Sequence, residues 1–183
     1  MIPNKTDDGA AGRMGVRWLA DRTGTAILEF ALAAPILVVL LLNLFDFSVL
    51  IWSSMQTENS AQMGAQAAFK TCAGGAIPAL TNCAGLSAAV TTAAQSTSLG
   101  TGVTVASGYP GETFYCTSGS TLQSVGTSPP SPYDCSGATP SDAAATPGDY
   151  IVVQVNYSYT PTFPGLSLAS AQTLTAKALQ RLQ

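Results

Sequence analysis

The sequence predicts an α+β protein: a long N-terminal transmembrane helix that continues into a small exported head with a short antiparallel sheet and one additional helix. Three observations predict this class. An uncharged apolar run extends from Phe30 to Phe45, and a helix needs about 20 mostly apolar residues to cross a bilayer. A strand-like alternation of side chains follows at 149–160, and all four cysteines come after the apolar run.

The apolar segment belongs to a helix that we expect at 25–71, with its first half in the membrane. It is longer than the apolar core of a removable signal peptide, which is the competing interpretation. Pro35 lies inside it and removes a backbone hydrogen bond, so we expect a kink or a loosened turn there. Small residues recur at Ala61, Gly64, Ala65 and Ala68, and such a stripe lets another element approach closely.

The charge distribution predicts the orientation of this helix. Four of the seven basic residues precede the apolar run: Lys5, Arg13, Arg17 and Arg22. By the positive-inside rule, residues 1–24 form a cytoplasmic leader and residues 72–183 an exported domain. Asp46 is interpreted as the outer end of the span, beside the interfacial aromatics Phe45, Phe47 and Trp52. A chain so poor in Lys and Arg has no basic surface for nucleic acid.

The four cysteines, Cys72, Cys83, Cys116 and Cys135, lie on the exported side, where two disulfides are expected. Three pairings are possible. Nearest neighbours, Cys72 with Cys83 and Cys116 with Cys135, are favoured because both bonds would close short loops. A zinc site is the competing interpretation, but the chain has no His and no Cys-x-x-Cys pair. No metal or cofactor is therefore expected.

The head is expected to combine one helix with several strands. Residues 86–98 have a short amphipathic helical pattern, and Gly100 and Gly102 end it. Short strands are expected at 103–107 and 113–117, and the clearest strand is at 149–160, where Ile151, Val153 and Val155 share one face. The segment 118–148 is rich in Ser, Gly and Pro, and we expect it to be disordered or loop-rich. The last segment fits a helix or a strand; a strand is favoured because the sheet needs a further partner.

No catalytic constellation is visible in the sequence. Without His, a Ser-His-Asp or Cys-His arrangement is excluded, and the Gly100–Gly102 stretch lacks the spacing of a phosphate loop. The carboxylates are scattered, and nothing favours a pairing of Glu112 with Asp134 over solvated loop positions. A membrane-bound hydrolase is therefore disfavoured, and neither enzymatic activity nor a small-molecule substrate is expected.

The stretch RTGTAILEFALAAPILVVLLL, which begins at Arg22, resembles the N-terminal signature of type IV pilin precursors. It is most similar to the start of TadE-like proteins, the minor pilins or pseudopilins of the bacterial Tad pilus. The strand region DYIVVQVNYSYTPTFP and the terminal Arg181 also look like the end of that family. Thr25 departs from the major type IV pilins, which often have an apolar aromatic residue at this position.

This resemblance implies a function. A prepilin peptidase would cut between Gly24 and Thr25, and Glu29 would be the carboxylate required for assembly with other pilin and pilus-assembly subunits. The protein would then be an inner-membrane protein with one span, its N-terminus in the cytoplasm and its C-terminus in the periplasm, and extracellular in the pilus after processing. The alternative is an unprocessed membrane-anchored adhesin or envelope scaffold, in which the Glu29 carboxylate only reaches to water at the membrane interface.

Overall fold

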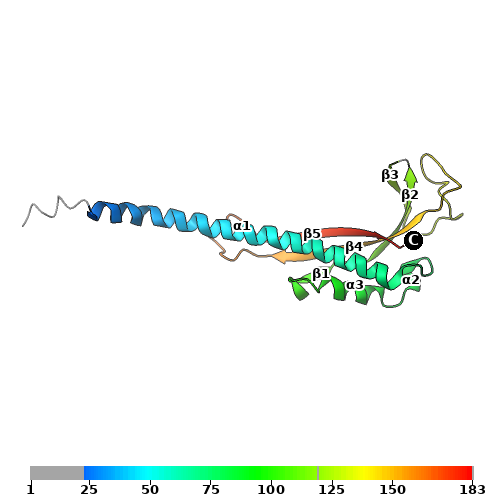
Figure 1. Cartoon of the computed structure of the whole chain (residues 1–183), viewed down its shortest axis with the longest axis horizontal. Coiled ribbons are helices and arrows are strands. Elements are labelled where there is room, and N and C mark those ends of the chain that lie inside the picture. The colour runs from blue at the N-terminus through cyan, green and yellow to red at the C-terminus, as the bar shows by residue number, and fades with distance from the viewer. Residues whose placement is uncertain (1–22, 119, 183) are drawn as a thin grey trace, which may run out of the picture.

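A computed structural model describes residues 23–118 and 120–182 of the chain. Its longest element is the helix α1 (Thr23–Cys72), which runs through Pro35 without interruption and is about 75 Å long. Figure 1 shows that the head packs on the C-terminal part of α1, whereas the N-terminal part projects away from it. The long apolar helix is thus confirmed. The expected leader lies outside the described residues, apart from Thr23 and Gly24.

The head contains one antiparallel sheet built around a central long strand. Its strands are β1 (Val103–Val105), β2 (Gly111–Ser118), β3 (Thr121–Gly126), β4 (Gly148–Tyr159) and β5 (Gln172–Arg181). One edge of β4 pairs with β5 along its length, and the other edge pairs with β1 near Val155 and with β2 near Ile151. β3 pairs only with β2. The alternating strand expected at 149–160 is confirmed as β4, and the C-terminal segment is a strand.

Helical segments connect α1 to the sheet. They are α2 (Ala79–Asn82), α3 (Leu86–Ala94) and the 3-10 segment η1 (Gly100–Gly102). α3 follows Gly85, which has a left-handed φ of 83° that a residue with a side chain rarely adopts. The expected helix at 86–98 is therefore present but ends at Ala94, and the head has the shorter α2 and η1 in addition.

β3 was not expected, because the sequence at 118–148 has no alternation. The strand is mostly exposed or half-buried, so it forms through its hydrogen-bonded ladder with β2 and not through burial of an apolar face. Backbone hydrogen bonds also hold the part of the segment 118–148 that follows β3. The amide of Cys135 donates to the carbonyl of Ala145 at 2.9 Å, and its own carbonyl accepts from Asp142 at 3.1 Å.

The core lies where α1 and α3 cover one face of the sheet. Ile151, Val153 and Val155 of β4 are completely buried there, and burying each such side chain contributes about 1.5–3 kcal/mol. α1 contributes mainly small residues to this core, so its backbone lies close to β4 and α3. A Cβ atom at Gly64 would lie 3.2 Å from Cγ1 of Val153 and 3.3 Å from Cγ1 of Val90.

Replacing Gly64 by valine should therefore destabilise the head. Three added carbon atoms must displace Val90 or Val153, and overpacking of this kind costs about 1–3 kcal/mol. The measurement is thermal unfolding of the full chain in detergent. Gln62→Val is the matched control, because residue 62 is exposed on the same helix; an equal loss of stability in both variants would contradict the close packing at Gly64.

Candidate processing and assembly site

The Gly24–Glu29 segment forms the first turns of α1, at the end far from the head. All side chains from residue 24 to residue 30 are exposed, and open space surrounds the Cα of Gly24. Thr25 and Glu29 are four residues apart, which brings them to the same helix face with about 5–6 Å between their Cβ atoms. The segment is accessible to a second protein along its entire length.

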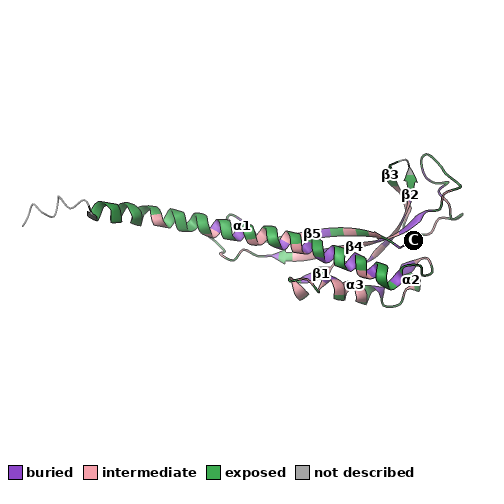
Figure 2. Ribbon diagram, viewed as in Figure 1, coloured by how far each residue is buried: buried purple, intermediate pink, exposed green. Residues whose placement is uncertain are grey.

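The next part of α1 is apolar on all sides and uncovered. Among the described residues, α1 is the one helix long and apolar enough to cross a membrane, with a mean hydropathy of 2.5 in its most apolar window and none of that window buried. Figure 2 shows this part of the helix as an almost unbroken exposed surface. A helix of this kind indicates membrane anchoring.

Two polar residues interrupt the apolar surface, and both hold the loop between β4 and β5. Asn43 donates from Nδ2 to the carbonyl of Leu166 at 3.0 Å and accepts at Oδ1 from the amide of Leu168 at 2.6 Å. One turn further, Asp46 accepts from the amide of Thr162 at 2.9 Å. Its own carbonyl accepts a hydrogen bond from the Tyr159 hydroxyl at 3.0 Å.

The sequence interpretation of Asp46 as merely the outer end of the span is thus incomplete. Its side chain is completely buried beneath the β4–β5 loop, so it serves as a structural acceptor for backbone amides. Asn43 was not singled out at all. A signal was present, because two polar residues three positions apart in an apolar run lie on one helix face.

Further along α1, the side that faces the head differs from the side that faces away. The buried positions carry small or hydroxyl side chains: Ser53, Thr57, Ser60, Ala61, Gly64, Ala65 and Ala68. Several outward positions carry large apolar side chains that remain exposed, Ile51, Trp52, Met55, Met63 and Phe69, between exposed polar residues such as Glu58 and Gln62. The head therefore leaves several large apolar side chains uncovered on the part of α1 against which it packs.

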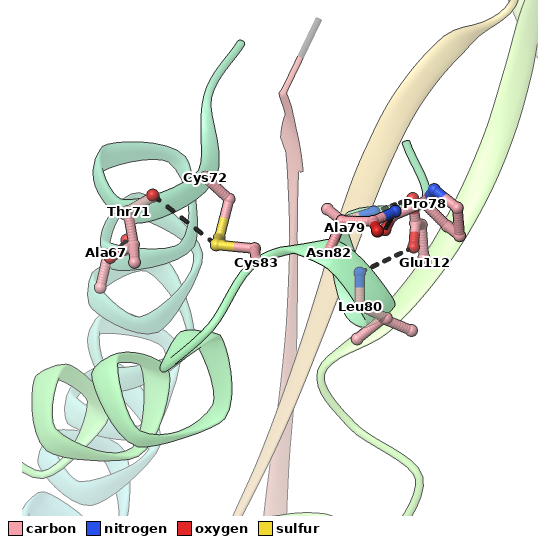
Figure 3. Close-up of a disulfide and its surroundings, with 9 residues drawn as sticks. All are labelled: Ala67, Thr71, Cys72, Pro78, Ala79, Leu80, Asn82, Cys83 and Glu112. Atoms are coloured by element: carbon pink, nitrogen blue, oxygen red, sulfur yellow. Dashed lines mark hydrogen bonds between the residues drawn. A yellow bond between two sulfur atoms is a disulfide. The ribbon is translucent and has the colours of Figure 1, made fainter. Parts of the chain in front are cut away.

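The four cysteines form two disulfides, Cys72–Cys83 and Cys116–Cys135. This is the nearest-neighbour pairing that the sequence favoured. The first bond joins the last residue of α1 to the segment between α2 and α3 (Figure 3). The second lies in a small buried cluster with Ala138 and restrains the segment that follows β3.

A pair of buried carboxyl groups lies near the first disulfide. Glu112 of β2 accepts hydrogen bonds from the amides of Ala79 at 2.8 Å and Leu80 at 3.1 Å, at the start of α2 (Figure 3). Asp149 of β4 lies on the same face of the sheet, because Glu112 is opposite Ile151 in the register. The sequence interpretation of Glu112 as a solvated loop residue is wrong, since its side chain is buried.

Asp149 has no obvious source of stabilisation as an anion. Both of its carboxyl oxygens are buried and, among the residues that the structure describes, no donor forms a hydrogen bond to them. Burial, and after it the negative charge of Glu112, raises the pKa of Asp149 to about 7. A protonated Asp149 can instead donate a hydrogen bond to the Glu112 carboxylate.

The described residues offer no metal-binding group, because nowhere in 23–118 or 120–182 do three His, Cys, Asp or Glu side chains gather. Two backbone amides of α2 hold the Glu112 carboxylate, and both carboxyl groups are buried in the head. Their arrangement fits a structural role in the head.

These features define a class: a protein with one long apolar helix, exposed at its N-terminal half, and a small disulfide-bonded α+β head. Comparison with known families gives a more specific result for the first part of the chain: residues 24–66 match the family described as TadE-like protein. This match confirms the resemblance found in the sequence. No curated protein and no solved structure matches the chain.

The matched range begins at Gly24 and ends within the part of α1 that packs on the head. It therefore contains the entire Gly24–Glu29 segment, the apolar surface and the two loop-holding residues, Asn43 and Asp46. The match indicates a protein related to the Tad pilus. The TadE-like family is a structural one, and its match implies interaction with pilus components. The sheet and both disulfides lie beyond the matched residues.

Proposed function

We propose that this protein is a minor pilin or pseudopilin of a Tad-type pilus. In this proposal, α1 holds the precursor in the bacterial inner membrane with the N-terminus in the cytoplasm and the head in the periplasm. A prepilin peptidase cuts between Gly24 and Thr25, and the mature chain enters the assembling pilus. The observation that carries the proposal is the TadE-like match over residues 24–66, on a helix whose apolar surface its own head leaves uncovered.

The geometry around Gly24 supports processing at this bond. A membrane peptidase must unwind the first turn of α1 to reach the backbone, and glycine costs a helix about 1 kcal/mol relative to alanine. Gly24 therefore weakens the helix at the bond to be cut. Its missing side chain also lets the backbone enter a narrow protease site.

Cleavage would change the electrostatics of the segment. It removes the basic leader with Arg22 and creates an α-amino group on Thr25. Glu29, one helical turn along, can pair with this amine or with the same amine of a neighbouring subunit. Because an unpaired carboxylate is costly in an apolar medium, the pair fixes the register between packed helices.

The uncovered apolar surface of α1 supports a role in assembly. Outside the bilayer, exposed residues such as Leu32 and Leu40 would face water unless other helices cover them. The outward side chains Trp52, Met55 and Met63 extend this surface along the head. A bundle of α1 helices from several subunits would bury both parts, which is the arrangement that a pilus shaft requires.

Gly24→Val tests the processing step directly. The branched side chain should block entry of the backbone into the peptidase, so the variant should accumulate in membranes at full length. Mass measurement of the membrane fraction from cells with the Tad machinery provides the result. Gly15→Val, a change within the leader, should be cut normally; a Gly24→Val chain that is shortened as efficiently as the wild type would contradict cleavage after Gly24.

A further inference from the structure

The loop between β4 and β5 is the part of the head nearest to the apolar end of α1 (Figure 1). Its residues 160–171 carry no charge. The hydrogen bonds to Asn43 and Asp46 fix it against α1, and the rings of Phe163 and Phe45 pack edge to face with their centroids 6.1 Å apart. The position of this loop relative to a membrane therefore follows from the position of Asn43.

The length of α1 places Asn43 at the outer boundary of a bilayer. From Thr23, next to the last basic leader residue Arg22, the helix rises about 30 Å to Asn43. The hydrocarbon core of a bilayer is also about 30 Å thick. With Arg22 at the cytoplasmic boundary, Asn43 and the loop that it holds lie at the opposite boundary.

Six backbone amides of the loop have hydrogen-bond partners within the protein. Thr162 and Phe163 donate to the Asp46 carboxylate, and Leu168 donates to Asn43. Leu166 and Ser167 donate to the carbonyl of Phe163, and Ala169 donates to Oγ of Ser167. Irregular backbone is tolerated at a lipid boundary only when its polar groups have partners in the protein.

Two leucine side chains of the loop are exposed to solvent. Leu168 is 82% exposed and Leu166 is 54% exposed. The loop has no charged residue beside them. At the same level of α1, Leu44 and Phe45 are exposed as well. Isolated exposed leucines are ordinary on a protein surface, but a contiguous apolar group indicates an interaction site.

We propose that Leu166 and Leu168 insert into the outer leaflet, so that the β4–β5 loop acts as a lipid-binding foot of the head. The partner is the boundary between acyl chains and headgroups, where apolar side chains on a polar support are stable. The foot sets how deeply α1 lies in the membrane and holds the head upright on the surface. This inference rests on membrane insertion of α1 alone and does not require cleavage or pilus assembly.

Lipid contact can be measured with an environment-sensitive thiol label. All four native cysteines are in disulfides, so Leu168→Cys adds a single free thiol at a highly exposed position. The full chain is reconstituted in phosphatidylcholine vesicles that contain lipids spin-labelled near the headgroup end of the acyl chain. Leu32→Cys, in the apolar part of α1, and Leu80→Cys, on α2 and 47% exposed, are the matched controls.

If the loop binds lipid, the shallow spin label should strongly quench the fluorescence of a label at position 168. Quenching at position 32 should be greater with a spin label deep in the acyl chain. Position 80 should stay unquenched. A label at 168 that is as unquenched as that at 80, beside a quenched label at 32, would overturn the proposal. Adding Asn43→Ala to the Leu168→Cys chain should reduce quenching at 168, because both hydrogen bonds of Asn43 to the loop are lost; unchanged quenching would refute its positioning role.

Discussion

A Glu29→Ala chain is expected to be cut after Gly24 and yet to support no pili. The change leaves the glycine and the basic leader intact, so the peptidase still recognises the precursor. It removes the carboxylate that would pair with the α-amino group of Thr25. The unpaired amine would then have to enter an apolar helix bundle, which is strongly unfavourable. The measurement is the amount of surface pili together with the mass of the chain.

Glu58→Ala is the control for this experiment. Glu58 is another exposed carboxylate on α1, in the part that packs on the head. Its loss should leave both cleavage and piliation unchanged. Normal amounts of pili from the Glu29→Ala strain would remove Glu29 from the assembly mechanism. Loss of pili from both strains would contradict a role that is specific to Glu29.

The second large effect is on the stability of the head, through Asp149. Its pKa of about 7 lies above the usual 3.8 of an aspartate. Between these two pH values the folded chain binds a proton that the unfolded chain has released. The contribution of Asp149 to stability is therefore fully present below pH 4 and is lost as the pH rises from there through 7, by up to about 4 kcal/mol, since one pKa unit corresponds to about 1.4 kcal/mol and solvent screening lowers the total.

Asp149→Asn should abolish this loss. The amide resembles the protonated carboxyl group and can donate to Glu112 at every pH. The advantage of the variant over the wild type should be larger at pH 8 than at pH 5, in thermal unfolding of the detergent-solubilised chain. Asp142→Asn, at an exposed site, should change neither value. If the difference between Asp149→Asn and the wild type were the same at both pH values, Asp149 would not be the titrating group.

The sequence was sufficient for elements whose pattern is local and periodic. The alternation around Ile151 and Val153 predicts β4, and the apolar run followed by small residues predicts α1 almost to its ends. The disulfides were favoured by short spacing between neighbouring cysteines. In each case the same residues determine both the local structure and its burial, so no knowledge of distant contacts was needed.

The remaining features depend on contacts between segments far apart in the chain. Asp46 meets the amides of Thr162 and Phe163 across the β4–β5 turn, and Glu112 meets Asp149 only because of the register between β2 and β4. β3 lacks an apolar face and depends on the ladder of β2. No periodicity within one segment reports such pairs, although polar residues inside apolar runs mark the positions where they occur.

The central claim is that α1 is first a membrane anchor and then, after a cut before Thr25, an assembly helix. The most direct test is N-terminal sequencing of this chain from sheared surface fractions and from membranes. A terminus at Thr25 is expected in the surface fraction, beside uncut precursor in the membranes. A chain that begins at Met1 in every fraction would contradict it and would favour an unprocessed, membrane-anchored adhesin or scaffold.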